Sequence, residues 1–139
     1  MYKFLKEVAQ ELGLDFHYAR RDFANLYRAE KIEDLNKVQL FLDPVITETS
    51  FDEYGNPISE LNTGHFMLLK HSDFQEDDYE QRYLDYIKPL LVEVQKDILK
   101  EVGCSKMGIN FWQSVEIINA LDENLDGLII NYQIVKELC

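Results

Sequence analysis

The sequence predicts one α+β domain, with an antiparallel sheet of two hairpins and two helices on one face of that sheet. Two stretches of the chain place apolar residues at helical spacing, and two pairs of β-branched and aromatic runs are each joined by a turn sequence. These elements follow the order helix, strands, long helix, strands, which is typical of a layered α+β fold. The 139 residues are the length of one domain, and 46% hydrophobic residues suffice for a core.

The N-terminal segment predicts an amphipathic helix over residues 2–12, and Gly13 suits its C-terminal cap. The apolar residues on one face of this helix are Phe4, Leu5, Val8, Ala9 and Leu12. Residues 15–19 alternate as a short strand does, although apolar residues over 15–37 also fit a helix. We predict a short strand at 15–19, followed by an irregular or briefly helical segment.

The first hairpin is predicted from two β-rich runs around a turn. Residues 38–49 are rich in β-branched and aromatic residues, and Pro44 indicates an edge position or a bulge. Residues 52–57 form a turn cluster, and a second strand is expected over 64–70. The tip of this long hairpin therefore carries Tyr54-Gly55-Asn56-Pro57.

The longest helix is expected over residues 76–102, with Gly103 at its end. Asp73 and Glu76 resemble a capping pair, and an acidic first turn suits the helix dipole. Pro89 should kink the helix rather than end it, because the apolar stripe continues on both sides. That stripe predicts a buried face of Ile87, Leu90, Val94 and Ile98.

The chain closes with a predicted hairpin of strands 111–121 and 128–135, in which Asp126-Gly127 is a strong turn dipeptide. Trp112 is expected to anchor the core at the start of the first of these strands. Cys104 is expected to be a small buried residue near a helix end, and neither it nor Cys139 has a CxxC partner.

One segment resembles the first half of a calcium-binding EF-hand loop. Its Asp122, Asn124, Asp126 and Gly127 have the required spacing, but the twelfth position is Gln133 instead of a bidentate glutamate. A strand-like run also follows where a helix should leave the loop. We therefore predict a turn and no metal site there, and we expect the three isolated histidines to be structural. No cofactor is predicted.

The formal net charge of −12 disfavours nonspecific binding to nucleic acid and to anionic membrane surfaces. No apolar run is long enough to span a membrane, and charges interrupt the apolar N-terminus as they do not in a signal peptide. An intracellular location is expected. No nucleophile elbow or glycine-rich phosphate loop occurs, so no catalytic residue is predicted. A binding or regulatory domain with an unidentified cytoplasmic partner, and a small enzyme built from dispersed residues, remain as alternatives.

The layout of helix, long hairpin 38–70, long helix 76–102 and closing hairpin 111–135 resembles that of bacteriophage tail-terminator and head-completion (neck) proteins. The stretch Val115–Asn119 and the stretch Asn124–Tyr132, with its Asp-Gly dipeptide, carry most of this resemblance. The resemblance implies a structural subunit without catalytic residues. It would form a ring with copies of itself, commonly a hexamer, and dock to other neck and tail proteins. It would act in the virion at the head–tail junction, after assembly in the host cytoplasm.

The charges indicate where neighbouring subunits could meet. Residues 1–37 have a net charge of 0, residues 38–87 a net charge of −9 and residues 88–139 a net charge of −3. A closed ring needs two different, complementary surfaces on each subunit. The residues expected at this interface are Arg20, Arg21 and Arg28 on one side, and Tyr54, Asn56, Asp77 and Asp78 on the other. The alternative is that these arginines pair locally with Asp22, Glu30 and Glu33.

Overall fold

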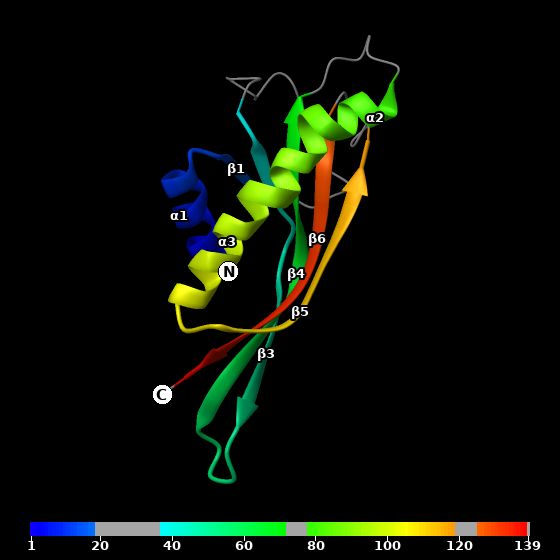
Figure 1. Cartoon of the computed structure of the whole chain (residues 1–139). Helices are drawn as coiled ribbons and strands as arrows, with labels where there is room; N and C mark the ends of the chain where they lie inside the picture. The colour runs from blue at the N-terminus through cyan, green and yellow to red at the C-terminus, as the bar shows by residue number, and fades with distance from the viewer. Residues whose placement is uncertain (19–36, 72–77, 119–124, 139) are drawn as a thin grey trace.

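A computed structural model describes residues 1–18, 37–71, 78–118 and 125–138 of the chain. It shows the predicted α+β fold, in which one sheet carries its helices on one side (Figure 1). The predictions made for residues 19–36, 72–77, 119–124 and 139 lie outside the described residues. No helix within the described ranges is long and apolar enough to cross a membrane.

The sheet has six strands in the order β1-β2-β4-β6-β5, and β3 pairs with β4 beside β2. The strands are β1 (Asp15–Tyr18), β2 (Gln39–Leu42), β3 (Ile46–Phe51), β4 (Pro57–His71), β5 (Gly108–Ile117) and β6 (Leu125–Glu137). The two predicted hairpins lie side by side because β4 pairs with β6 from Ser59 to His71. Four strand pairs are antiparallel, but β1 and β2 are parallel. The sheet is therefore mostly antiparallel, as predicted, and the parallel placement of β1 is a feature that the sequence did not indicate. Residues 19–38 supply the length that a parallel connection requires.

The first predicted strand is divided in two at Pro44. Strand β2 ends at Leu42, opposite Phe66, and β3 begins at Ile46, opposite Thr63. Three residues of this strand, 43–45, thus face two residues of β4, which is a bulge of one residue. The predicted bulge is confirmed, but the uninterrupted strand over 38–49 is not.

Helix α1 (Tyr2–Leu12) ends as predicted at Gly13, which has a left-handed φ of 71°. The long helix begins after Asp78, whose carboxylate accepts hydrogen bonds from the backbone N–H groups of Glu80 and Gln81 at 3.0 and 3.5 Å. It runs through α2 (Tyr79–Arg82), two π-helical segments, η2 (Tyr83–Ile87) and η3 (Leu90–Val94), and α3 (Gln95–Cys104).

The predicted kink takes the form of these two π-helical segments, one on each side of Pro89. Proline has no N–H, and its ring clashes with the carbonyl of the residue four positions earlier, so a wider helical turn relieves the clash. The helix ends at Cys104, one residue after the predicted Gly103. Cys104 is exposed, so its predicted burial was wrong.

The main core lies between the sheet and both helices. It contains Leu5 and Val8 of α1, Ile87, Leu90, Ile98 and Val102 of the long helix, and residues at every second position of β2, β4 and β6. Val94 and Trp112 are partly buried against this core, and Trp112 packs edge-on against Phe66. A second, smaller cluster on the opposite face of the sheet contains Phe41, Met67, Leu69, Leu125 and Ile129. These alternate with the residues of the main core, as side chains of a strand do.

Candidate functional site

The residues that were predicted at the subunit interface, and that the structure describes, lie at two separate places in the fold. Tyr54 and Asn56 lie at the tip of the β3–β4 hairpin, at the far end from the start of the long helix (Figure 1). Asp78 lies at that helix start, where its carboxylate caps the first turn. Arg20, Arg21, Arg28 and Asp77 lie outside the described residues. Among the described interface residues, Tyr54 and Asn56 therefore do not share one patch with Asp78 within a single chain.

We name residues 46–62 the arm; they comprise β3, the connecting turn and the first residues of β4. The arm extends beyond both helices (Figure 1). All six residues of β3 are exposed, including Ile46 at 61% and Phe51 at 58%. The arm contains four acidic residues and no Lys, Arg or His, so its net charge is −4. Two large apolar side chains of β3 thus lie exposed to water on an acidic surface.

The tip of the arm is held by Asp52. Its carboxylate accepts hydrogen bonds from the backbone N–H groups of Tyr54 and Asn56, both at 2.9 Å, and from Asn56 Nδ2 at 3.1 Å. Gly55 has a φ of 83°, which favours glycine. The hydrogen bond from the Asn56 N–H is the largest cause of the lowered pKa of Asp52, because it stabilises the carboxylate. This turn places Tyr54, which is 81% exposed, at the tip of the arm.

Strand β5 forms the opposite edge of the sheet. Its exposed apolar residues include Ile109, Phe111 and Val115. Phe111 and Ile46 occupy the same row of the sheet, since Ile46 pairs with Thr63, Thr63 with Gln133, and Gln133 with Phe111. These four residues, with others, line a hollow of about 280 Å³ on the face away from the helices. The exposed strands β3 and β5 therefore border the same face of the sheet, the face away from the helices.

The calcium-loop look-alike does not form a turn at its glycine. Asp126 and Gly127 belong to β6, where they pair with Lys70 and Leu69 of β4. The prediction of a turn at this dipeptide was wrong. A Cβ atom on Gly127 would lie 1.9 Å from the carbonyl oxygen of Leu68, so the glycine allows two strands to approach closely.

The Asp126 carboxylate instead binds Arg82 of the long helix. Arg82 Nε donates to Asp126 Oδ2 at 2.8 Å and Nη2 donates to Oδ1 at 2.7 Å. Both side chains are buried, so this bidentate pair fastens the start of the helix to the sheet. Asp122 and Asn124 lie outside the described residues. Within the described part of the chain, no three His, Cys, Asp or Glu side chains are grouped so that they could hold a metal ion.

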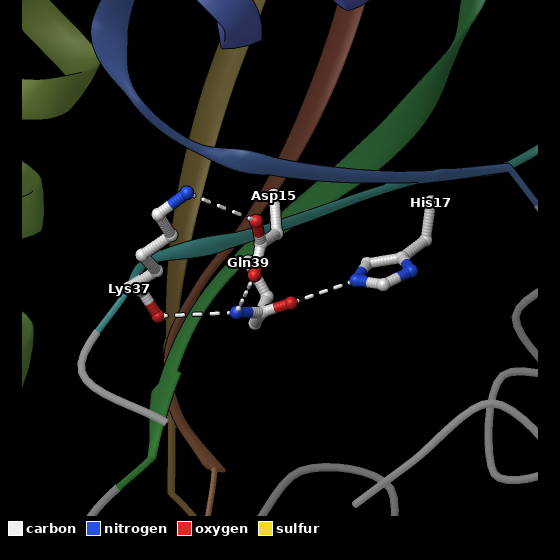
Figure 2. Close-up of polar contacts among 4 residues, drawn as sticks. All are labelled: Asp15, His17, Lys37 and Gln39. Carbon is white, nitrogen blue, oxygen red and sulfur yellow. Dashed lines mark hydrogen bonds and ion pairs between the residues drawn. The ribbon is translucent and has the colours of Figure 1, made fainter. Parts of the chain in front are cut away.

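A polar cluster joins β1 to β2 on the face away from the main core (Figure 2). The buried amide of Gln39 donates to Asp15 Oδ2 at 2.9 Å and to the carbonyl of Lys37 at 3.2 Å. Its oxygen lies 2.7 Å from His17 Nε2, and Lys37 Nζ lies 3.6 Å from Asp15 Oδ1. Because the Gln39 oxygen can only accept, His17 Nε2 carries a proton. The His17 ring also stacks on Phe41 at 4.6 Å.

This cluster was not predicted, although its signal is visible in the sequence. Asp15 and His17 are alternate residues of β1, and Gln39 begins β2 two residues after Lys37. Alternation alone predicts exposed polar faces, whereas Gln39 is buried. The cluster satisfies the polar atoms that the parallel strand pair buries, so we interpret it as structural.

A second polar group lies at the bulge. The buried Asp43 pairs with His65, and the backbone N–H of Asp43 donates to the carbonyl of His65 at 3.3 Å. The hydroxyl of Tyr132 is buried nearby and has no hydrogen-bond partner among the described residues. Burial, followed by the charge of Asp43, raises the pKa of Tyr132 far above its ordinary value. The sequence predicted structural histidines, and both His17 and His65 occupy such positions.

No protein-family model matches this chain, and no curated protein matches it at a significant level.

Proposed function

We propose that this protein is a structural subunit that acts by assembling head to tail with copies of itself into a ring. The observation that supports this proposal best is the arm. All six residues of β3 are exposed, and the strand includes large apolar side chains. A strand of this kind adds little to the core of its own chain, but it offers an edge and apolar side chains to another molecule.

The polar clusters support the same proposal. Arg82 binds Asp126, Gln39 binds Asp15 and His17, and each of these contacts fastens one element of the fold to another. Side chains used in this way hold the fold together and leave the exposed surfaces to carry the function. Exposed apolar side chains on β3 and β5 are then best explained as contacts with other molecules.

The resemblance in layout to tail-terminator and neck proteins suggests the setting. In that setting the ring, commonly a hexamer, lies at the head–tail junction of a bacteriophage particle and docks to tail-tube and connector proteins. The net charge of −12 suits protein partners better than direct contact with DNA. No cofactor takes part in this proposed role.

Native mass spectrometry of the full chain, together with negative-stain electron microscopy, tests the proposal. We expect one closed oligomer and particles with a central opening. A monomer at every concentration measured would contradict the proposal and favour a binding or regulatory domain. A two-fold dimer would contradict the head-to-tail arrangement, because only a heterologous contact closes a ring.

A further inference from the structure

Two edges of the sheet carry the next inference, which rests on the proposed function. Within the described part of the chain, β3 pairs only with β4, and β5 pairs only with β6. Each strand therefore has one edge of backbone N–H and C=O groups that no described strand covers. These edges lie on opposite sides of the same sheet.

Neither edge strand has many of the features that usually keep an unpaired edge from pairing with another chain. Charged side chains, prolines and bulges normally prevent an edge from pairing with another chain. Each strand has one charged residue, Glu48 in β3 and Glu116 in β5, and one register irregularity, near the end of β3 and near the start of β5. The other residues include β-branched and aromatic types that favour strands. Both edges are thus suited to strand pairing.

The strand directions are complementary for a second copy. Strand β3 is antiparallel to β4, β4 to β6, and β6 to β5, so β3 and β5 run in opposite directions. A neighbour in the same orientation, placed beside β5, brings its β3 into an antiparallel pair. Antiparallel pairing is slightly more stable per residue than parallel pairing.

The charges agree with this arrangement. Strand β3 runs toward the acidic arm tip, and β5 begins two residues after the exposed Lys106. The acidic tip of one copy therefore comes to the end of the sheet where its neighbour exposes Lys106. Pairing of β3 with another β3 would instead bring two arms of charge −4 together. Pairing of β5 with another β5 would leave both β3 edges uncovered.

We propose that the free edge of β5 in one copy pairs antiparallel with the free edge of β3 in the next copy, so that neighbouring sheets form one continuous sheet around the assembly. The occupant of each edge is a second copy of this chain. Ile46 of one copy and Phe111 and Val115 of the next lie on the same face of this continuous sheet and then cover one another's exposed apolar surface.

Cysteine cross-linking tests this pairing directly. In a background with Cys104→Ser and Cys139→Ser, one variant carries Ser50→Cys in β3 and a second carries Gln113→Cys in β5; both positions are exposed and lie on the face of the sheet away from the helices. A short bismaleimide should link the two variants only when they are mixed. A chain that carries both cysteines should give a ladder that ends at the size of the ring. Links within the Gln113→Cys variant alone would instead show two-fold pairing of β5 and overturn the inference.

An edge-blocking substitution gives an independent measurement. Val115→Lys places a charge on β5 at a side chain that is 40% exposed, and Leu84→Lys does the same on the long helix at 45% exposure. We expect Val115→Lys to weaken assembly at least about tenfold, as loss of an interface contact commonly does, while Leu84→Lys changes it less than about twofold. Both variants should fold, since neither side chain is in the core.

The outcomes distinguish this inference from the proposed function. A ring that forms without β3–β5 cross-links, and that Val115→Lys leaves unchanged, would overturn the edge pairing and keep the ring. A chain that stays monomeric, with no cross-links in the mixture, would overturn both.

Discussion

The buried pair of Arg82 and Asp126 gives the strongest single prediction about stability. The side chain of Arg82 is 4% exposed and that of Asp126 is 0% exposed, and two hydrogen bonds of 2.8 and 2.7 Å join them. Removal of one partner leaves the other charge buried without this bidentate ion pair, which costs about 3–5 kcal/mol. We expect Arg82→Met and Asp126→Leu each to lower the free energy of unfolding by that amount. For a chain of this length, the loss corresponds to a decrease in Tm of roughly 10–15 °C.

The double variant Arg82→Met/Asp126→Leu removes both charges. It should lose less than about 2 kcal/mol, because apolar side chains of similar volume can replace a buried ion pair at little cost. Urea unfolding followed by far-UV circular dichroism, and by the fluorescence of the single tryptophan, Trp112, measures these losses. Lys88→Met, an exposed site on the same helix, is the control and should change stability by no more than about 0.5 kcal/mol. Additive losses in the double variant, or a single loss below about 1 kcal/mol, would refute the reasoning.

Three further predictions follow from buried positions. Gly127→Ala should lower the free energy of unfolding by about 3 kcal/mol or more in urea, because its Cβ would lie 1.9 Å from the Leu68 carbonyl oxygen. Gly103→Ala is the control: its Cβ would have no neighbour within 4 Å, so it should raise the free energy of unfolding by about 0.5–1 kcal/mol. Equal effects of the two substitutions would show that crowding is not the cause. Leu90→Ala should cost about 2–5 kcal/mol in the same assay, since Leu90 is buried between helix and sheet, and a loss under about 0.5 kcal/mol would contradict that placement. Tyr132→Phe should change stability by less than about 1 kcal/mol at pH 7, because the buried hydroxyl has no partner among the described residues. Because the pKa of Tyr132 is raised in the folded chain, this tyrosine ionises first in the unfolded chain, and the wild type loses stability as the pH rises above about 10. An equal loss of stability in Tyr132→Phe would argue against this cause.

The sequence by itself determined the local elements. Apolar residues at helical spacing predicted α1 and the long helix, and Gly13 predicted the end of α1. Pro44 and Pro89 predicted the bulge and the kink, because the restriction that proline places on its own backbone is local. The turn at the arm tip followed from Asp52, Gly55 and Asn56, whose hydrogen bonds lie within five consecutive residues.

The tertiary structure decided which of these signals prevailed where distant segments meet. Asp126-Gly127 is a turn sequence, yet it continues β6 because β4 runs alongside it and Arg82 holds its carboxylate. The parallel placement of β1, and the burial of Gln39 among Asp15, His17 and Lys37, also depend on contacts between separate segments. Local propensity differs by about 1 kcal/mol between residue types, whereas breaking one buried ion pair or crowding one close strand contact costs several kcal/mol. Such contacts outweigh the local signal, and they become visible only once the strands lie side by side.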